Sequence, residues 1–476
     1  MIPKIFNTSS TSQLTQKLMI DLSINNIYSE NAISFLSIPC NYKEILLRQE
    51  LFVRVIDKGK ITEVEQCLKL LKELERTSEI LKSAKNEIEK LHYKIEQLSA
   101  YAKVIQFFSE LNGLGTLFFD VSDYFNKQKN IALEMTESIK YCENKMVPLM
   151  SGLISISDKI WITPDDNVTD DFTCISKFAE NVGLIVPSKK RFLLTVDQSL
   201  SAAVCAMYSV TVSEIYQRLQ RFNEINVDEV LGYIPELEFI AEVASVVKKV
   251  GYKGIKYCFP KVTQTPQYIA KGIADITLVS NVSGVIVTND VDFTDDSISF
   301  LMGANSGGKT SYLRAVAINL ILFLAGCPIF AEHASIYPFE YIDAHFTSDE
   351  RFTDVGRLDD ERLRVNEIFR NVGNKHSFIF FNETFSGTDN KLGFSLLKTT
   401  VKNLRKKGIF ALWVTHFQEV LNLKETVLTV QVGENNQRTY RVQKTKNRFA
   451  SYANDILKKY GIDKESLKKR GESCGT

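Results

Sequence analysis

Apolar residues recur at helical spacing through much of the first half of the chain. Between residues 58 and 112 there is no proline, no glycine after Gly59, and a run of apolar side chains mostly three or four residues apart. That spacing marks one buried face of a helix. A single helix here would reach on the order of 75 Å at 1.5 Å per residue. We expect one long lever, strut or coiled coil, or else two packed helices that separate near Thr77 and Ser78.

Helical spacing returns at residues 124–150 and 194–250, on both sides of a segment with a different pattern. That segment, residues 154–191, has short β-branched runs interrupted by Pro164, Gly183 and Pro187. Such breakers delimit strands and turns. The pattern indicates a small insert within a mostly helical region, which we place at residues 1–250.

After Gly251, strand-like and helical stretches alternate along the chain. This alternation is typical of an α/β domain with a parallel sheet. We therefore predict an α/β nucleotide-binding domain at residues 251–476. Its strand-like stretches are Val285 to Thr288, Ile298 to Met302, Phe378 to Phe381 and Ile409 to Thr415.

A phosphate-binding motif follows the second of these strands. The segment GANSGGKTS matches the P-loop pattern G-x-x-x-x-G-K-[ST] and is followed by an apolar helix. Its glycines would let backbone N–H groups surround phosphate oxygens, Lys309 would neutralise the terminal phosphates, and Thr310 would offer a hydroxyl to Mg²⁺. ATP and Mg²⁺ are therefore the expected ligands. The expected binding residues are Gly303, Ala304, Asn305, Ser306, Gly307, Gly308, Lys309, Thr310 and Ser311.

The two later strands end in residues that suit nucleotide hydrolysis. Asn382 and Glu383 follow SFIFF, where a P-loop ATPase usually has an aspartate for the metal and a glutamate for the attacking water. Glu383 is thus the candidate general base. Asn382 has the shape of aspartate without its charge, which predicts weaker Mg²⁺ binding and slow hydrolysis. His416 follows the strand IFALWVT and is expected to reach a γ-phosphate, so Glu383, His416 and Lys309 form the candidate catalytic set.

Composition adds few constraints. The chain of 476 residues has 58 Lys and Arg against 57 Asp and Glu, a net charge of +1, so any nucleic-acid contact needs a local basic patch. Its 8 cysteines are scattered without a C-x-x-C pair, which favours reduced thiols over disulfides or zinc. No signal-like apolar run opens the chain, and the apolar stretch 315–331 is shorter than a bilayer requires. We expect a cytoplasmic protein that does not bind membranes.

Four motifs, in this order along the chain, resemble the ATPase domain of the MutS family. They are GANSGGKTSYLRAVA, FIFFNETFSGTD, LWVTHFQEV and the tail sequence ASYANDILKKYGI. Upstream, SFLSIPCNYKEILLRQELFVRV is similar to the start of the MutS core domain, and GVIVTNDVDF to the segment that enters its P-loop. The resemblance is weakest at residues 114–194. It implies an ABC-type P-loop ATPase domain preceded by a mostly α-helical core and lever domain, with residues 114–194 as a small insert or reduced clamp.

The resemblance also implies roles for single residues. Two ATPase domains of this family face each other and complete each other's sites, which implies a homodimer. Thr310 and Asn382 would hold the metal, Asp389 would lie in the loop that faces the partner copy, and His416 would be the switch histidine. Adenine would lie near Ile286, where members of the family often have an aromatic residue.

One departure from the family concerns the helix that enters the partner's site. That helix normally begins with a Ser-Thr pair, whereas Leu358 and Asp359 stand at the nearest match here. Arg357 is a candidate charge donor across the dimer in place of the missing hydroxyl. The alternative is a surface arginine paired with Asp359 or Asp360.

Other departures bear on the expected function. Because the core-like sequence begins by about Asp21 and the sequence stops soon after LKKRGESCGT, we expect neither the family's mismatch-reading and connector domains nor its nuclease appendage. The basic cluster Lys189, Lys190 and Arg191 lies where the family places a DNA-gripping clamp, although such a cluster is a solvated loop more often than a DNA contact. We expect an ATP-dependent dimer that moves its levers on double-stranded or branched DNA, without mismatch recognition. The alternatives are a nucleotide-gated scaffold for a protein partner, with slow or no hydrolysis, and a kinase of a small substrate.

Overall fold

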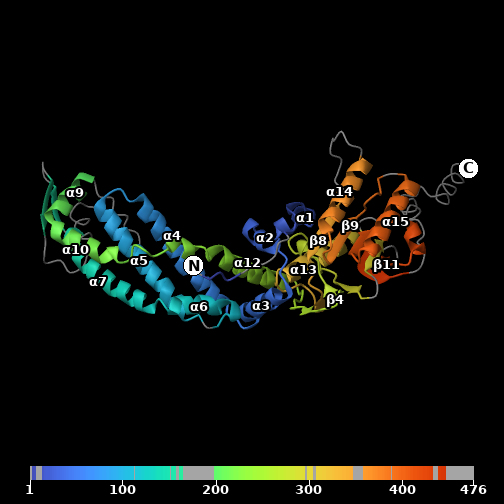
Figure 1. Ribbon diagram of the computed structural model, residues 1–476, viewed down its shortest axis with the longest axis horizontal. Helices are drawn as coiled ribbons and strands as arrows, with labels where there is room; N and C mark the ends of the chain where they lie inside the picture. Colours follow the sequence, from blue (N-terminus) through green and yellow to red (C-terminus); the bar gives the residue numbers. More distant parts are fainter. Residues whose placement is uncertain are drawn as a thin grey trace, which may run out of the picture. The chain divides into compact units, whose positions relative to one another are not determined.

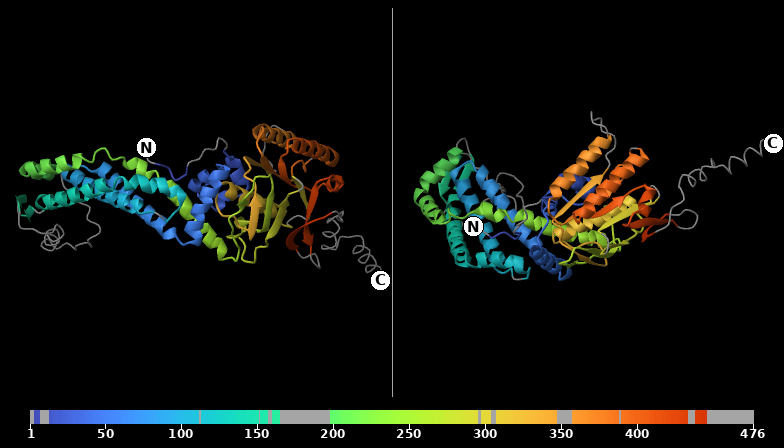
Figure 2. Two further views of the ribbon diagram at one scale, coloured as in Figure 1. Left: turned by 60° about the horizontal axis from the view of Figure 1, so that its bottom comes forward. Right: turned by 45° about the vertical axis from the view of Figure 1, so that its right-hand side comes forward.

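The computed structural model describes residues 3–6, 13–111, 113–150, 152–156, 160–164, 198–294, 297–303, 307–346, 357–387, 389–432 and 438–445. Its contacts divide the chain into two compact units (Figure 1, Figure 2). The first unit contains Met1–Asn7 and Arg54–Ala241, and the second contains Thr8–Val53 and Glu242–Thr476. This grouping differs from the division at residue 250, because the segment 8–53 joins the second unit.

The first unit is mainly helical. Its two longest helices, α4 (Ile61–Ser83) and α5 (Glu87–Ser109), pack side by side. The second face of α5 packs against α6 (Phe119–Asn126) and α7 (Lys129–Met150). The remaining helical elements are η2 (Val53–Asp57), η3 (Thr116–Phe118), α9 (Gln198–Met207), α10 (Ser209–Gln220), α11 (Val227–Leu231) and α12 (Ile234–Gly251), the last of which continues into the second unit.

The single long helix that the spacing favoured is wrong, and the alternative of two packed helices is confirmed. The break lies after Ser83 and not at Thr77 and Ser78, whose hydroxyls donate to the Leu74 carbonyl within α4 at 3.0 and 2.7 Å. Asn86 ends the break by accepting a hydrogen bond from the Glu89 N–H at 2.9 Å, while the Glu89 carboxylate accepts from the Lys85 N–H at 2.9 Å. These two hydrogen bonds cap the start of a separate helix, α5.

The predicted insert is described only in part. Strands β1 (Gly152–Ile156) and β2 (Ile160–Pro164) form an antiparallel hairpin. The rest of the insert, including Lys189, Lys190 and Arg191, lies outside the described residues.

The second unit is built around a sheet of six strands in the order β12-β11-β6-β10-β9-β8. All neighbours are parallel except β11 and β12. The central strands β6, β10 and β9 are almost entirely buried, as expected of a parallel sheet covered on both faces. The strands are β6 (Ile298–Met302), β8 (Tyr341–Phe346), β9 (Ser377–Asn382), β10 (Phe410–Val414), β11 (Thr426–Val432) and β12 (Arg438–Lys444).

Helices and a second sheet cover the two faces of this sheet. On one face, α14 (Arg357–Val372) and α15 (Asn390–Lys406) pack on β6, β9 and β10. On the other lie the buried α13 (Lys309–Leu324) and a sheet of four strands in the order β3-β7-β4-β5. The predicted burial of the apolar helix after the P-loop is thus confirmed. The four strands are β3 (Lys261–Val262), β7 (His333–Ile336), β4 (Tyr268–Ile273) and β5 (Asn289–Phe293).

One predicted strand is wrong. Residues 285–288 form no strand, and Val285 is 90% exposed. Pairing with β4 begins only at Asn289, opposite Ile273. β-branched residues at 285–288 therefore lack a neighbouring strand, and local propensity alone does not make a strand. Elsewhere the predicted strands coincide with β6, β9 and β10, so the chain has a helical region followed by an α/β domain with mixed sheets.

The N-terminal segment of the second unit contributes α1 (Gln16–Asp21), η1 (Ile24–Asn26), α2 (Glu30–Leu36) and α3 (Tyr42–Phe52). The Cys40 N–H donates to the Leu324 carbonyl at 2.8 Å, and Arg48 Nη1 donates to the Ala325 carbonyl at 3.2 Å. A Cβ on Gly326, whose φ is +75°, would lie 2.5 Å from the Arg48 Cβ. Glycine is therefore required where α3 meets the end of α13. Among the described helices, none combines the length and apolarity that a membrane span requires.

Candidate active site

The predicted phosphate loop joins β6 to α13. Gly303, directly after β6, has φ +138°, and Gly308, directly before α13, has φ +97°. Both values favour glycine over residues with a Cβ. Gly307, Thr310 and Ser311 lie at this same helix start, where free backbone N–H groups point out of the helix. Ala304, Asn305 and Ser306 lie outside the described residues.

Lys309 is the first residue of α13 and is 5% exposed. Its Nζ donates to the Gly303 carbonyl at 2.9 Å, so the side chain folds back across the loop. Burial lowers the pKa of Lys309, and the negative charge of Glu383 acts in the opposite direction. A cation that burial has partly desolvated gains more from a nearby anion than an exposed cation does.

Glu383 and His416 follow neighbouring strands. β9 and β10 are parallel with Asn382 opposite Val414, and the Glu383 N–H donates to the Val414 carbonyl at 2.9 Å. His416 Nε2 then lies 2.9 Å from Glu383 Oε1. Two residues that are far apart in sequence therefore form one polar pair, at the sheet edge where β6 also ends.

Asn382 lies at the end of β9, before Glu383. Its side-chain oxygen is buried and accepts no hydrogen bond from any residue that the structure describes. An unused acceptor in this place fits a water molecule bound to Mg²⁺, a metal that usually keeps several waters. Within the described ranges no group of three or more His, Cys, Asp and Glu side chains could hold a metal. The residues present thus fit a Mg²⁺ ion bound largely through water and phosphates.

The residues after Asn382 form a strained turn, which we call the base turn (residues 383–386). Glu383 and Phe385 have φ values of +56° and +67°. This left-handed conformation costs roughly 1–2 kcal/mol per non-glycine residue. The Phe385 N–H donates to the buried Glu361 carboxylate of α14 at 2.7 Å, and the Phe385 ring packs 6.2 Å from the Trp413 ring. A hydrogen bond to a charged group stabilises by about 1.5–3 kcal/mol, which offsets much of the roughly 2–4 kcal/mol of strain in the two residues together.

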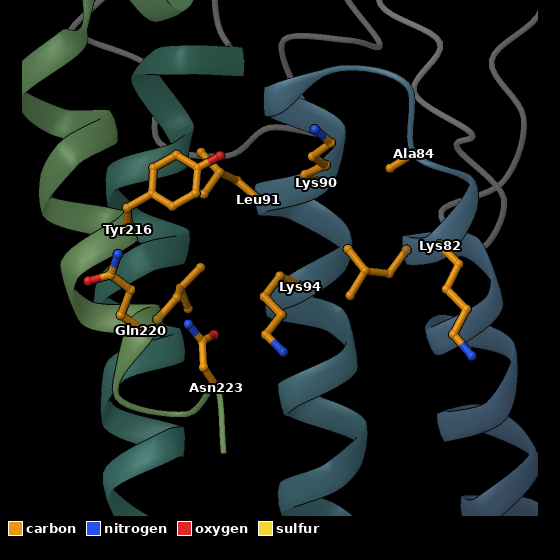
Figure 3. A pocket seen from close by; sticks show the side chains of 10 residues that line it. Lys82, Ala84, Lys90, Leu91, Lys94, Tyr216, Gln220 and Asn223 are labelled. Atoms are coloured by element: carbon orange, nitrogen blue, oxygen red, sulfur yellow. The ribbon is translucent and has the colours of Figure 1, made fainter. Parts of the chain in front are cut away.

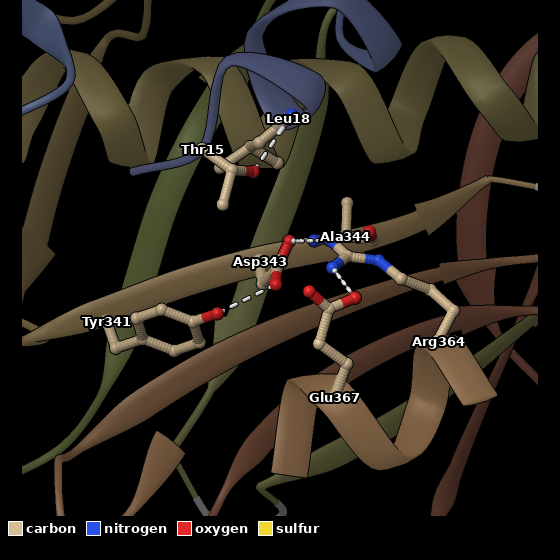
Figure 4. Close-up of polar contacts among 7 residues, drawn as sticks. All are labelled: Thr15, Leu18, Tyr341, Asp343, Ala344, Arg364 and Glu367. Carbon is tan, nitrogen blue, oxygen red and sulfur yellow. Dashed lines mark hydrogen bonds and ion pairs between the residues drawn. The ribbon is translucent and has the colours of Figure 1, made fainter. Parts of the chain in front are cut away.

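A buried ion pair also anchors α14 to the sheet (Figure 4). Arg364 Nη2 donates to Asp343 Oδ1 of β8 at 2.7 Å, and the Tyr341 hydroxyl donates to the other Asp343 oxygen at 2.7 Å. Arg364 Nη1 reaches Glu367 on the same helix at 2.8 Å. Burial raises the pKa of Asp343, although the Arg364 charge opposes that shift. Sequence reasoning missed this network, although an aspartate in the middle of the apolar strand YIDAHF is a readable signal.

His345, also on β8, connects that strand to the base turn. Its Nδ1 lies 2.8 Å from the hydroxyl of Thr384, and the imidazole is 5% exposed. Burial lowers the pKa of His345 to about 4, and the charges of Lys17 and Arg364 act in the same direction. The imidazole is therefore neutral at physiological pH, and it holds Thr384 as a hydrogen-bonding group without charge.

The other predicted site residues have clear placements. Ile286 is 7% exposed in the extended segment before β5. Asp389 caps α15 by accepting from the Lys391 and Leu392 N–H groups at 3.0 and 3.1 Å. Leu358 is partly buried against the core of the second unit. Asp359 pairs with Arg362 at 3.7 Å, and the side chain of Arg357 lies outside the described residues.

Tyr440 is a residue that motif reasoning did not find. It lies on β12 with φ +57°, and a Cβ on Gly308 would lie 3.0 Å from its ring. Asn289 holds this strand by donating to the Tyr440 carbonyl at 3.0 Å and accepting from the Val442 N–H at 2.8 Å. A half-exposed aromatic ring therefore lies against the phosphate loop. No local pattern marks Tyr440, because only the pairing of β12 with β11 brings it there.

Comparisons with known proteins point to one family. The family model described as MutS domain V matches residues 299–469. The chain is 27% identical over 282 residues to the DNA mismatch repair protein MutS of Methanosarcina mazei, covering 56% of this chain and 29% of that protein. It is 24% identical over 254 residues to MutS of Methanococcoides burtonii, covering 50% and 26%. A DNA mismatch repair protein, msh-2 of Neurospora crassa, is 32% identical over 143 residues, covering 29% and 15%. The matched part spans less than a third of the length of each relative.

Proposed function

Because this chain belongs to the MutS family, we propose that it is an ATPase whose second unit binds and hydrolyses ATP with Mg²⁺. The observation that carries the proposal is the convergence of a buried Lys309, the Glu383–His416 pair and the glycine-bordered helix start at one sheet edge. A P-loop followed by two parallel strands that end in a base and a histidine suits phosphoryl transfer to water.

Each residue has a role in the proposed reaction. Backbone N–H groups at the start of α13 bind phosphate oxygens, and Lys309 exchanges the Gly303 carbonyl for the terminal phosphates. Glu383 accepts the proton of the attacking water, and His416, 2.9 Å away, orients that carboxylate and faces the γ-phosphate. Thr310 and Asn382 would hold Mg²⁺, which supplies positive charge to the phosphates. Asn382 lacks the charge of aspartate, so we propose slow turnover.

For architecture, we propose an ABC-type P-loop ATPase domain at residues 251–476 and a helical core and lever domain at residues 1–250. The supporting observation is the position of the P-loop strand β6 between β10 and β11, with the α13 helix start at its end. We further propose a homodimer in which each copy completes the other's site. In this dimer Asp389 would face the partner copy and Arg357 would reach the γ-phosphate bound by the partner. Ile286 would pack against the adenine.

The proposed biological activity is ATP-dependent binding of double-stranded or branched DNA in the cytoplasm, without mismatch recognition. ATP binding would move the long helices, as two-state elements do when a ligand favours one state. The DNA mismatch repair relatives support DNA as the partner. The second candidate is a nucleotide-gated scaffold for a protein, and the near-neutral charge of +1 favours it. DNA retention that depends on nucleotide supports the first, and stoichiometric protein without nucleic acid supports the second.

A steady-state ATPase assay tests the enzymatic part of the proposal. It compares the wild type with Lys309→Ala and Glu383→Ala, with and without branched DNA. We expect Lys309→Ala to lose nucleotide binding, and Glu383→Ala to retain bound ATP while hydrolysis falls about 100-fold or more. Glu383→Ala hydrolysing at the wild-type rate would remove its assignment as the base.

A further inference from the structure

A groove lies in the first unit, far along the chain from the nucleotide site. It has a volume of about 410 Å³ and is formed by the end of α4, the start of α5 and the end of α10 (Figure 3). All of its lining residues belong to the first unit. They are Leu81, Lys82, Ala84, Lys90, Leu91, Lys94, Tyr216, Leu219, Gln220 and Asn223.

The charged residues of the lining are all lysines. Lys94 is partly buried, and its Nζ donates to the neutral Gln97 amide oxygen at 3.0 Å. Lys82 is exposed and makes no ion pair with any residue that the structure describes. Lys90 Nζ lies 2.8 Å from the Glu87 carboxylate, which also accepts a hydrogen bond from the Tyr216 hydroxyl. The lining therefore holds three lysines and no carboxylate, and Glu87, which pairs with Lys90, lies outside it.

The geometry of the donors favours a phosphate backbone. Lys90 and Lys94 lie one helical turn apart, so their attachment points are separated by about 6 Å along α5. This is the scale of neighbouring phosphates on a nucleic-acid strand. The amides of Gln220 and Asn223 add donors on the opposite wall, and lysine binds phosphate as a point charge. Leu81, Leu91 and Leu219 add apolar surface to the lining, and the aliphatic part of a lysine side chain packs favourably on such a surface.

We propose that this groove binds backbone phosphates of nucleic acid through Lys82, Lys90 and Lys94. The inference rests on the proposed DNA binding and names a place for it outside the predicted insert. Lys94 supports the assignment. Burial lowers the pKa of Lys94 because it removes water from the charged ammonium group, and a bound phosphate would stabilise that charge again.

The test measures binding of a fluorescein-labelled 30-base-pair duplex and a 30-nucleotide single strand by anisotropy, at 50 to 200 mM salt. The full-length wild type is compared with the triple variant K82Q/K90Q/K94Q. The matched control, K69Q/K127Q/K140Q, removes the same charge from Lys69 of α4, from Lys140 of α7 and from Lys127 between α6 and α7, none of which lines the groove. We expect the triple variant to bind the duplex about tenfold or more weakly, with a log–log salt slope shallower by about 3.

The outcomes separate the two ideas. A wild type that binds neither probe at 50 mM salt rejects the proposed DNA binding and this groove with it. If the wild type binds DNA and both triple variants lose binding to the same extent, the groove is not the phosphate-binding site, while the proposed DNA binding stands. A poly-glutamate peptide that binds wild type and not K82Q/K90Q/K94Q, while DNA binding is unchanged, would assign the groove to an acidic protein partner and overturn the proposal.

A second inference comes from an independent observation, the strain in the base turn. Glu383 and Phe385 are both left-handed, and neither is glycine. The Phe385 N–H donates to Glu361 at 2.7 Å, and this hydrogen bond links the turn to α14. Glu361 is 5% exposed and lies one turn before Arg364, which fastens the same helix to Asp343 at 2.7 Å.

We infer that Glu361 is a positioning residue for Glu383. α14 is fixed to β8 through Arg364, and through Glu361 it keeps the base turn in its strained form. Without that acceptor Phe385 would return to an ordinary conformation, and the carboxylate of Glu383 would leave its place beside His416. This inference rests on the proposed role of Glu383 as the base. If it holds, the rate of hydrolysis depends on α14, because this helix keeps Glu383 in place.

The test separates positioning from mere structure. Glu361→Leu removes the acceptor, Glu361→Gln keeps an oxygen, and Glu367→Gln is a control on the same helix whose side chain is 57% exposed. We expect Glu361→Leu to lower kcat for ATP about tenfold or more, with KM and ATP affinity within about twofold of wild type. Glu361→Gln should recover most of the rate. Phe385→Gly, which removes the strain, should raise kcat in the Glu361→Leu background.

Three outcomes would overturn this inference. The first is a Glu361→Leu variant that matches the wild type in kcat. The second is a Glu361→Leu variant that loses ATP affinity and thermal stability together with kcat, as a change at a structural residue would. A wild type that binds ATP without hydrolysing it rejects both the proposed ATPase and the positioning role.

Discussion

The two units use charge differently. In the first unit the ion pairs are exposed, as in Lys72–Glu238 at 2.8 Å and Lys103–Glu73 at 3.1 Å, with side chains 37–54% exposed. In the second unit Arg364–Asp343 and Arg48–Glu44 are at most 9% exposed. Exposed pairs are screened by water, whereas buried pairs must be satisfied. Charge in the first unit is thus available to a partner. The second unit also has exposed pairs, such as Arg362–Asp359, but its buried pairs fix elements of its core.

The largest expected effect on stability comes from breaking the buried Arg364–Asp343 pair. Arg364→Ala leaves Asp343 charged in the core, which costs about 3–5 kcal/mol of unfolding free energy. Urea unfolding followed by circular dichroism measures it. The control is Arg362→Ala on the same helix, whose pair with Asp359 at 3.7 Å is exposed and contributes at most about 1 kcal/mol. Equal losses in the two variants would contradict the contrast between buried and exposed charge.

The next effect is a dependence of stability on pH. The pKa of His345 is lowered to about 4 in the folded protein, below the 6.5 of an unperturbed histidine. The unfolded chain therefore takes up a proton first as pH falls from about 7 to 4, and stability is lost over that window. The loss approaches about 3 kcal/mol. Unfolding at pH 7, 5.5 and 4 should show a weaker pH dependence in His345→Gln than in wild type.

A matched histidine in the first unit sharpens that prediction. His92 lies on α5 with its side chain 34% exposed, 3.6 Å from Glu96. At pH 7 we expect His92→Gln to change the free energy of unfolding by at most about 1 kcal/mol, because its contact with Glu96 is exposed. A larger loss would mean that the first unit also depends on this contact.

A smaller effect is expected at Gly326. Its φ is +75°, and an added Cβ would lie 2.5 Å from the Cβ of Arg48, so Gly326→Ala meets both strain and a clash. We expect a loss of about 1–3 kcal/mol. Gly59, before α4, has φ +69° with nothing within 4 Å of an added Cβ, so Gly59→Ala should lose only about 1 kcal/mol. Thermal unfolding compares the two, and equal shifts would show that the contact with Arg48 is easily displaced.

The smallest effect is expected for an exposed pair. Lys72→Ala removes the Lys72–Glu238 contact of the first unit, and we expect a change of at most about 1 kcal/mol. Raising salt from 50 to 500 mM should remove most of that change. A larger, salt-insensitive loss would show that the first unit also depends on specific ion pairs.

Features that depend on neighbouring residues could be predicted from the sequence. The P-loop, the strands β6, β9 and β10, and the buried helix α13 all have local patterns. Their order along the chain was sufficient to nominate Glu383 and His416, which the structure places 2.9 Å apart. The break between α4 and α5 was readable too, because Asn86 and Glu89 have the spacing of a capping pair.

Features that depend on distant contacts could not be predicted. The segment 285–288 has strand propensity but no partner, while Tyr440 reaches Gly308 only through the pairing of β12. The bond from Phe385 to Glu361 and the ion pair of Arg364 with Asp343 join residues 24 and 21 positions apart. Such bonds depend on how α14 packs, which no window of sequence contains.

The close fit of Gly326 against Arg48 has a consequence for synthesis of the chain. Helices α1 to α3 leave the ribosome before α13, because the carbonyl groups of Leu324 and Ala325 that this segment binds are made about 280 residues later. The first unit, Arg54–Ala241, is complete well before then. Because domains generally fold as units during translation, the helical unit should be folded while helices α1 to α3 still lack α13, the helix whose end this segment binds. Newly made chains would thus expose an apolar N-terminal segment to chaperones until α13 emerges.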